Sequence, residues 1–186
     1  MAVYTRVGAE EIEAFLEKFN VGHLTSAKGI AEGVENSNYL IETEQSRFIL
    51  TLYEKRVNTQ DLPFFIDLLD HLSAKKCPVP PMIADRSGKK IQQLCGKSAC
   101  LIKFLPGVSV TTPTTAQAHA AGRALGAMHA AVADFDRSRA NDMDHRGWGK
   151  LADDCGPDGL NAIEAGLDDL VHAELDRSEE HTSELQ

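Results

Sequence analysis

A polar turn between two strand-like segments contains the residue types best suited to contact a phosphate group. The turn reads Gly33-Val34-Glu35-Asn36-Ser37-Asn38, and the apolar segments 39–43 and 48–53 follow it. A glycine and small polar residues allow backbone N–H groups to point at an anion. The Ser37 hydroxyl and the Asn36 and Asn38 amides add further donors. An ordinary hairpin with a polar tip has the same composition, so the pattern alone leaves both interpretations open.

Charged residues near this turn bear on whether it suits a phosphate. Phosphoryl transfer depends on well-placed positive charge and hydrogen-bond donors more than on covalent chemistry. Lys55 lies on the same strand face as Thr51 and Tyr53, because strand side chains alternate between two faces. Its ammonium group could contact a phosphate, or it could be a solvated group at the end of the strand. Glu35 would repel a phosphate unless its carboxylate turns outward.

The elements expected around the turn alternate between strand and helix patterns. Period-two alternation predicts strands, and longer apolar runs with helical spacing predict helices. Three prolines make the connector after the first helix non-helical. The predicted elements are, in order, an antiparallel meander at 29–53, a helix at 62–72, a connector at 77–81, strands at 90–94 and 99–105, and an alanine-rich helix at 115–133. This order predicts an α+β fold with a protein kinase-like N-lobe and hinge.

Several segments carry a more specific resemblance. They read EGVENSNYLIET, FILTLYEKR, DLPFFIDLLDHL, PVP, IKFLPG and RALGAMHAA. The chain resembles the homoserine kinases of the aminoglycoside phosphotransferase/choline kinase-like superfamily from residue 1 to about residue 176. EGVENSNY, FILTLYEKR and LPFF are typical of homoserine kinases, whereas PVP, FLPG and LGAMHA occur throughout the superfamily. The resemblance implies a kinase-like N-lobe at 1–105 and a hinge with a partial helical C-lobe at 106–176.

The resemblance also implies an activity. It is the ATP-dependent phosphorylation of the side-chain hydroxyl of L-homoserine in threonine biosynthesis, with ATP and Mg²⁺ as cofactors. Two alternatives remain open. One is a kinase for another small alcohol, such as choline or an aminoglycoside. The other is a nucleotide-binding module without catalytic activity.

Positions of the expected nucleotide site follow from the resemblance. The turn at 33–38 would cover the nucleotide, and Thr51 occupies the strand position where the superfamily has Lys or Arg. Phe104-Leu105-Pro106-Gly107 would form the hinge, whose backbone groups can pair with the edge of adenine. A turn that ends the strand is the alternative. Ile102, on the strand before the hinge, is a candidate for the wall of the adenine pocket.

Catalytic groups are harder to find in the sequence. The resemblance implies a His-x-Asp-x-x-x-x-Asn loop and a later Asp, which orient the acceptor hydroxyl and bind Mg²⁺. The nearest match is His172, but Glu174 stands where Asp is expected and the apolar spacing predicts an amphipathic helix at 159–176. We therefore assign no catalytic residue and no metal ligand, and we expect no turnover from these residues alone. Phe64 or Phe65 occupies the usual position of the acid that pairs with the strand lysine, so no such pair is expected.

Composition limits the partners and the location of the protein. The 186 residues are 42% hydrophobic and 25% charged, as in globular proteins, and the net charge of −9 argues against nucleic acid or an anionic membrane as a partner. No apolar run is long enough to span a membrane and the first residues lack a signal-peptide pattern, so we expect a cytoplasmic protein. The oligomeric state is unknown from the sequence.

The four cysteines do not form a metal-binding pattern. Cys77, Cys95, Cys100 and Cys155 include no Cys-x-x-Cys pair, so reduced thiols are expected, with a Cys95–Cys100 bridge as the alternative.

The second half of the chain contains an apolar stripe and a polar segment. Segment 134–149 is polar, which predicts a surface loop anchored by Trp148. The stripe on the helix at 115–133 needs a packing partner, and it consists of Ala121, Leu125, Met128 and Val132.

The last ten residues differ from the rest of the chain. RSEEHTSELQ is almost wholly polar and lacks a periodicity that continues the preceding helix. It also matches the translation of a common sequencing adapter. We therefore expect the natural sequence to stop near Asp176, with 177–186 as an adapter-derived tail outside the fold. A natural polar terminus is the alternative.

Overall fold

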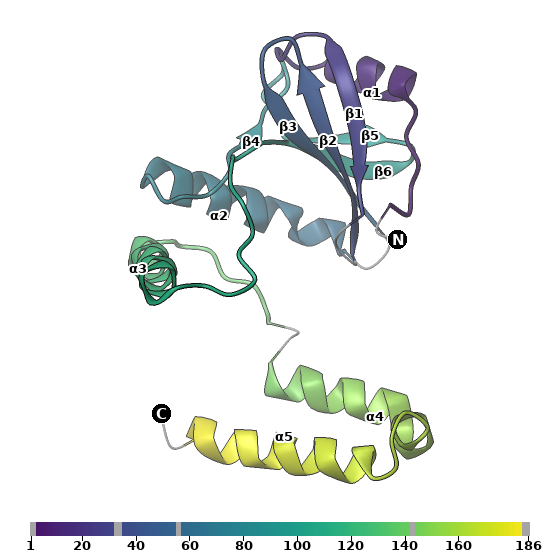
Figure 1. Cartoon of the computed structure of the whole chain (residues 1–186), viewed down its shortest axis with the longest axis vertical. Helices are drawn as coiled ribbons and strands as arrows, with labels where there is room; N and C mark the ends of the chain where they lie inside the picture. Colours follow the sequence, from purple (N-terminus) through teal and green to yellow (C-terminus); the bar gives the residue numbers. More distant parts are fainter. Residues whose placement is uncertain (1–2, 32–34, 55–56, 142–143, 184–186) are drawn as a thin grey trace. The chain divides into compact units, whose positions relative to one another are not determined.

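A computed structural model describes residues 3–31, 35–54, 57–141 and 144–183, with side chains up to residue 178. The chain divides into two compact units, Met1–Ser138 and Arg139–Gln186. Figure 1 shows the sheet and helices α1, α2 and α3 in the first unit and helices α4 and α5 in the second. The boundary after Ser138 places α3 with the sheet, whereas the lobe division at residue 105 remains a prediction.

The first unit is built on one antiparallel sheet. Its strand order is β1-β2-β3-β6-β4, and β5 pairs with β6 on the same sheet. Every pairing is antiparallel, which confirms the predicted fold class. The strands are β1 (Leu24–Ile30), β2 (Asn36–Thr43), β3 (Arg47–Tyr53), β4 (Met82–Ile83), β5 (Ile91–Leu94) and β6 (Lys97–Lys103).

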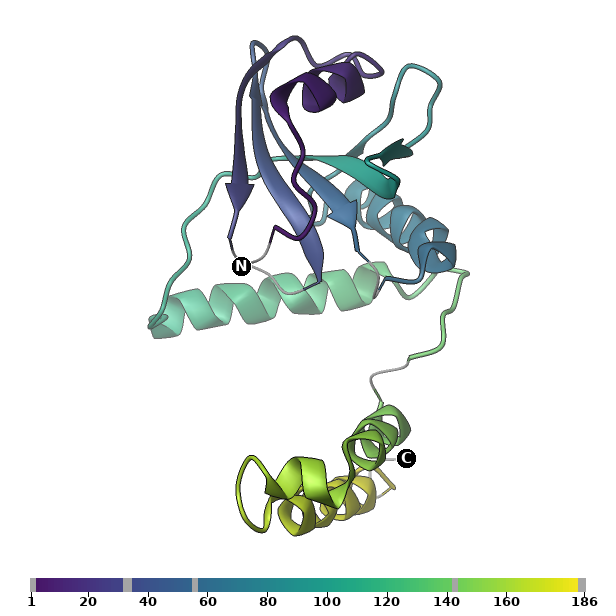
Figure 2. The same cartoon turned by 90° about the vertical axis from the view of Figure 1, so that its right-hand side faces the viewer.

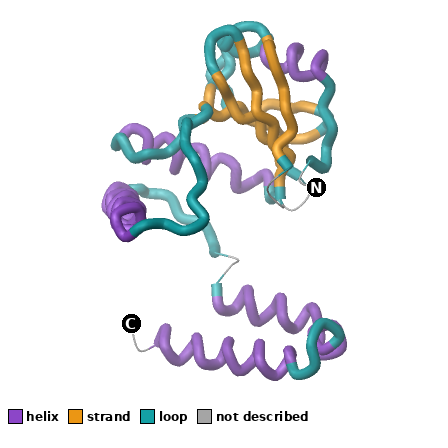
Figure 3. Tube along the Cα trace, viewed as in Figure 1, coloured by secondary structure: helices purple, strands orange, loops and turns teal. Residues whose placement is uncertain are grey.

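Helices lie before, within and after the sheet in sequence, as the tube in Figure 3 shows. A short 3-10 helix, η1 (Thr59–Asp61), leads into α2, and α2 contacts β4. No helix within the described part of the chain is both long and apolar enough to cross a membrane. The helices are α1 (Ala9–Leu16), α2 (Leu62–Ala74), α3 (Thr115–Ala131), α4 (His145–Asn161) and α5 (Leu167–Ser183).

Helix α1 supplies much of the core. Its first turn is closed by Glu11, whose carboxylate accepts a hydrogen bond of 2.8 Å from the Gly8 N–H. Ile12, Phe15 and Leu16 have helical spacing and are almost completely buried, because α1 lies across the strands of the sheet (Figure 2). The sequence prediction contained no helix here.

The sheet has two faces with different roles. Burial alternates along β2, as expected when one face of a strand is covered. We call the face that packs against α1 the rear face and the opposite one the front face. Side chains of Ser37, Tyr39 and Ile41 lie on the rear face, and those of Asn36, Asn38 and Leu40 lie on the front face. The rear-face core consists of Ile12, Phe15, Leu16, Phe19, Val21, Tyr39, Ile41, Phe48, Leu50, Leu52, Leu94, Ala99 and Leu101.

Several strand boundaries differ from the prediction, and two of them bear on the expected nucleotide site. Strand β2 begins at Asn36 rather than at residue 39, because Asn36 pairs with Tyr53 in β3. Half of the predicted polar turn therefore belongs to the sheet. Strand β6 ends at Lys103, so Phe104 and Leu105 follow the strand instead of completing it.

The prediction of one helix at 159–176 was also wrong. Helix α4 ends at Asn161 and α5 starts at Leu167. Gly166, directly before α5, has a φ of 84°, a left-handed conformation that does not occur inside an α-helix. His172 does lie on a helix, as predicted, and its Nδ1 is 2.9 Å from the Asp168 carbonyl oxygen.

The segment before α4 differs from its prediction, and α5 extends into the segment expected to be a tail. Helix α4 begins within the expected loop at 134–149, and Trp148 is 44% exposed on that helix, so its side chain does not anchor a loop. Helix α5 continues past residue 177 to Ser183. The expected tail is therefore partly helical, and Arg177 donates a hydrogen bond of 2.9 Å to Glu174 one turn earlier.

Helix α3 contacts α2 mainly through the residues at and after its C-terminal end. His71 Nε2 lies 2.9 Å from the Ala131 carbonyl oxygen, and the Phe64 and Phe135 rings meet edge to face with their centroids 5.8 Å apart. None of the helix's own residues is buried, and Leu125 of the apolar stripe is 50% exposed.

Candidate functional site

A hollow of about 390 Å³ opens on the front face of the sheet. It lies over strands β1, β2 and β3 and is closed at one edge by the segment after β6. Its walls are mostly apolar. The lining residues are Lys28, Gly29, Ile30, Ala31, Leu40, Ile49 and Phe104.

Strand pairing brings the apolar walls together. Leu40 of β2 is opposite Lys28 on one side and Ile49 on the other. Ile30 lies two residues after Lys28 in β1 and so shares its face. The three aliphatic side chains are half-buried and Lys28 is exposed at the rim. A flat apolar group with a polar extension would fit such a site.

Phe104 forms the edge of the hollow and is held by Arg47. The guanidinium carbon of Arg47 lies 4.4 Å from the Phe104 ring centroid, a cation–π contact. The Phe104 N–H donates to the Arg47 carbonyl oxygen at 3.1 Å, so this hinge donor is already used within the protein. Leu105 is 46% exposed and is not a lining residue. Ile102 pairs with Ile49 across the strands and is half-buried beside the hollow.

Further along β2, the front face becomes polar but stays uncharged. The Thr51 hydroxyl donates a hydrogen bond of 2.8 Å to the Asn38 side-chain oxygen. The Tyr53 hydroxyl and the Cys100 sulfur are 3.3 Å apart. Burial raises the pKa of Cys100 to about 11 and raises that of Tyr53 well above its usual value. All four side chains are therefore neutral at pH 7, and Thr51 supplies no positive charge where the superfamily has Lys or Arg.

The predicted polar turn divides into parts with different positions. Gly33 and Val34 lie outside the described residues, as does Lys55, and Glu35 is exposed just before β2. Asn36 and Asn38 face the front, as a phosphate contact would require. Within the described residues the buried Asn36 Oδ1 has no hydrogen-bond partner.

Ser37 lies on the opposite face of the sheet from Asn36 and Asn38. Its side chain is completely buried on the rear face, because it lies between two front-facing residues of a strand. Its hydroxyl donates a hydrogen bond of 2.7 Å to Glu54. The same oxygen accepts hydrogen bonds from the backbone N–H groups of Tyr4 at 2.9 Å and Thr5 at 3.0 Å. The Ser37 hydroxyl therefore does not face a ligand on the front face.

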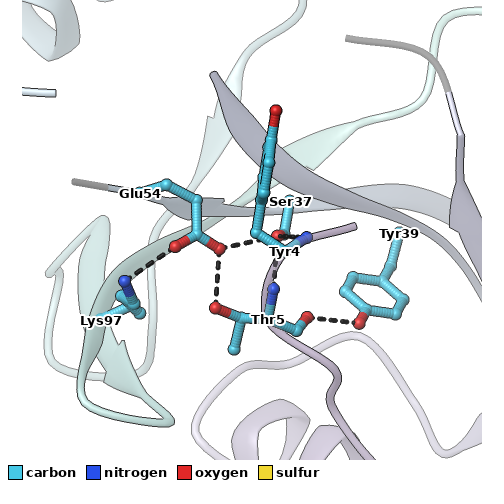
Figure 4. Close-up of polar contacts among 6 residues, drawn as sticks. All are labelled: Tyr4, Thr5, Ser37, Tyr39, Glu54 and Lys97. Atoms are coloured by element: carbon cyan, nitrogen blue, oxygen red, sulfur yellow. Dashed lines mark hydrogen bonds and ion pairs between the residues drawn. The ribbon is translucent and has the colours of Figure 1, made fainter. Parts of the chain in front are cut away.

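Glu54 is the centre of this rear-face network, as Figure 4 shows. One carboxylate oxygen accepts from the hydroxyls of Ser37 and Thr5, each at 2.7 Å. The other is 2.7 Å from the Lys97 ammonium, and the two side chains are only 11% and 26% exposed. Sequence reasoning missed both residues. Glu54 shares the face of Leu52 by alternation. A charged residue at a core-facing position was therefore the sequence signal that could have identified it.

The network determines the protonation state of Glu54. Burial alone would raise the pKa of this carboxyl group. Hydrogen bonds from Lys97, Thr5 and Ser37, together with the charge of Lys97, outweigh burial and lower the pKa to about 2. Glu54 is therefore a carboxylate throughout the physiological pH range.

This low pKa predicts a stability loss in acid. A carboxyl group whose pKa is lower in the folded state than its usual 4.5 stabilises the fold above about pH 4.5, and this contribution disappears as the pH falls toward 2. We expect Glu54 to account for about 1–3 kcal/mol of the difference in unfolding free energy between pH 6 and pH 2.5. Urea denaturation at both pH values, for the natural chain and Glu54→Gln, measures it. An equal acid-induced loss in both proteins would contradict this assignment.

Comparison with known proteins identifies the class. The profile of a family described as "Phosphotransferase enzyme family" matches residues 26–184, and the chain belongs to this family. The match continues beyond Asp176, into the segment expected to be a tail.

Two curated relatives are more specific. The homoserine kinase of Zymomonas mobilis subsp. mobilis is 51% identical over 177 residues, which are 95% of this chain and 55% of that protein. The homoserine kinase of Xanthobacter autotrophicus is 49% identical over 182 residues, which are 94% of this chain and 54% of that protein. The chain therefore spans about half the length of the curated relatives it matches.

A solved structure has the same fold. It is a spectinomycin phosphotransferase in complex with ADP and spectinomycin, with a TM-score of 0.73. The match covers 98% of this chain and 60% of that chain. At 14% sequence identity it supports the fold assignment alone.

Proposed function

We propose that this chain forms the nucleotide-binding part of an ATP-dependent kinase that phosphorylates the side-chain hydroxyl of L-homoserine, a step of threonine biosynthesis. The observation that carries this proposal is the 51% identity to a homoserine kinase across 95% of the chain. Family membership supports phosphotransfer in general, and the identity favours this particular substrate.

The hollow on the front face is our candidate site for adenine. Adenine is flat and apolar on both faces, so Ile30, Leu40 and Ile49 can pack against it while Phe104 borders its edge. The ribose and phosphates of ATP would extend from the adenine along β2 toward Asn38 and Asn36. Those amides could donate hydrogen bonds to phosphate oxygens. ATP supplies the phosphoryl group, and the residues of this chain bind and orient it.

Magnesium and the catalytic acid are not assigned to this chain. No group of three or more His, Cys, Asp or Glu side chains that could bind a metal ion occurs in the described part of the structure. The His172 side chain lies 3.5 Å from Asp153, and Glu174 pairs with Arg177. His172 and Glu174 both lie on helix α5, which supports a structural role for the two residues. We therefore expect these 186 residues alone to turn over no homoserine.

The test described below also distinguishes two other functions. A kinase for choline or an aminoglycoside would use the same nucleotide site with another acceptor. A nucleotide-binding module would bind ATP without transferring phosphate. We also propose that the enzyme acts in the cytoplasm on small molecules and has no nucleic acid or membrane partner.

A chimeric enzyme tests this proposal. The chain would replace the matching 177-residue segment of the Zymomonas mobilis enzyme. We expect the chimera to restore growth without threonine to a bacterium that lacks homoserine kinase. Phe104→Ala should raise its KM for ATP about tenfold, because one aromatic wall of the adenine site is lost. Leu105→Ala, next in sequence but outside the hollow, should leave KM unchanged.

The alternatives give different results in the same assay. A folded chimera that phosphorylates another alcohol but not homoserine would move the assignment to that alcohol. Tight ATP binding without transfer to any acceptor would support a binding module. An unchanged KM for ATP in Phe104→Ala would show that adenine does not occupy the hollow.

A further inference from the structure

The segment before α1 crosses the rear face and is fixed by two separate anchors. We call residues 3–8 the N-terminal strap. At one anchor, the Tyr39 hydroxyl donates to the Thr5 carbonyl oxygen at 2.7 Å and accepts from the Val7 N–H at 3.0 Å. At the other, the Ser37 hydroxyl accepts from the N–H groups of Tyr4 and Thr5. Figure 4 shows both anchors side by side.

Glu54 connects the second anchor to the rest of the sheet. Glu54 is the residue directly after β3. Its carboxylate accepts hydrogen bonds from Ser37 of β2 and Thr5 of the strap, and it pairs with Lys97 at the start of β6. Three strands and the strap therefore meet at one largely buried carboxylate. Both anchors include Thr5, but the Tyr39 hydroxyl bonds its backbone carbonyl whereas Glu54 bonds its side chain, so a substitution at Tyr39 removes no hydrogen bond of Glu54.

Ser37 connects the rear-face network to the part of β2 whose neighbouring side chains lie on the front face. Ser37 lies between Asn36 and Asn38 in β2, and alternation directs their amides to the opposite side of the sheet. Asn38 is additionally held by Thr51. Asn36 has no hydrogen-bond partner for its Oδ1 among the described residues. Its orientation therefore depends on the path of the strand, which Ser37 and Glu54 fix from behind.

We infer that Glu54 is a positioning residue for the nucleotide face, which holds Ser37 from the rear so that the amides of Asn36 and Asn38 point to where the phosphates of ATP bind. This inference rests on the proposed function, because it requires a nucleotide in the front-face hollow. Glu54 itself contacts no ligand. Its effect should therefore appear in the binding of phosphates and not in the binding of the base.

Comparison of ATP with adenosine separates these effects. In the 186-residue chain, Glu54→Gln should weaken ATP binding about tenfold while changing adenosine binding less than twofold. Ser37→Ala, which leaves the Glu54–Lys97 pair in place, should act in the same direction. Tyr39→Phe is the matched control, because it releases the other strap anchor and leaves Glu54 untouched. Titration calorimetry below the unfolding temperature of each variant gives the dissociation constants.

Hydrogen exchange tests the positioning without any ligand. Faster amide exchange at residues 36–38 in Glu54→Gln and Ser37→Ala, but not in Tyr39→Phe, supports the inference. Unchanged exchange there overturns it. An equal loss of ATP and adenosine affinity also overturns it, since that result means general damage to the fold. If exchange accelerates but the unsubstituted chain binds neither ligand, the nucleotide role of Glu54 fails and Glu54 is only an anchor of β2, while the chimera decides the proposed function separately.

Discussion

Phe15→Ala is expected to lower the free energy of unfolding of the first unit by about 3–5 kcal/mol, the range for removing a buried aromatic side chain. Phe15 is only 2% exposed. Its ring is 5.1 Å from that of Phe19, centroid to centroid, and both belong to the core between α1 and the sheet. The Lys18 ammonium lies 5.5 Å from the Phe15 ring centroid, so the substitution also removes this contact. Urea denaturation followed by circular dichroism measures the loss.

Phe65→Ala provides the comparison for this prediction. Phe65 lies on α2 and is 39% exposed, so its replacement removes less buried surface. We expect a loss of about 1 kcal/mol or less. Equal losses for Phe15→Ala and Phe65→Ala would mean that α1 does not form the centre of the core.

The sheet could be predicted because its signals are local. Alternation along 39–43 and 48–53 defined two paired strands, and prolines at 78, 80 and 81 separated them from the later strands. Helix α1 carried a comparable signal. Ile12, Phe15 and Phe19 have helical spacing and Glu11 can cap the helix, but Gly8 lacks the side-chain oxygen of a typical N-cap residue. The sequence interpretation therefore passed over a helix that the pattern supported.

The errors in the candidate site have a different physical origin. The composition of Asn36-Ser37-Asn38 is typical of a turn, yet pairing with β3 extends β2 through all three residues. Strand pairing is a tertiary effect that overrides local preference. Once β2 starts at Asn36, alternation alone places Ser37 on the rear face. The strand boundary was the missing information, and the direction of each side chain follows from it.

The break between α4 and α5 shows the limit of periodicity as a signal. The apolar residues at 160, 163, 167, 170, 171 and 175 fit one helix, but Gly166 interrupts them. A glycine that adopts a positive φ ends a helix more strongly than apolar spacing extends it. Turn signals should therefore be read before periodicity in such segments.

Glu54 and Lys97 could not be paired from the sequence. Their contact requires that β6 lies beside β3, although β4 and β5 come between them in the chain. Alternation along β3 indicates that Glu54 faces the core, but nothing local identifies Lys97 as its partner. The buried position of the pair is what gives it a measurable contribution to stability.

Lys97→Met is expected to lower the free energy of unfolding at pH 7 by about 2–3 kcal/mol. The substitution keeps the length of the side chain but leaves the Glu54 carboxylate, 11% exposed, without its cation. Breaking a buried ion pair costs about 3–5 kcal/mol, and we expect less here because Lys97 is 26% exposed. Without Lys97, the pKa of Glu54 should rise from its value of about 2, so the two proteins should become equally stable as the pH approaches 2.

A double-mutant cycle shows whether this loss comes from the ion pair. In the Glu54→Gln background, Lys97→Met removes a lysine that no longer faces a carboxylate. Its cost there should be less than about 1 kcal/mol, the range of ordinary surface substitutions. The difference between the two backgrounds is the interaction energy of the pair, and urea denaturation of the four proteins at pH 7 measures it. If Lys97→Met costs the same in both backgrounds, Lys97 stabilises the fold through the packing of its aliphatic chain. The charge of Glu54 is then balanced by the hydrogen bonds of Ser37 and Thr5 alone.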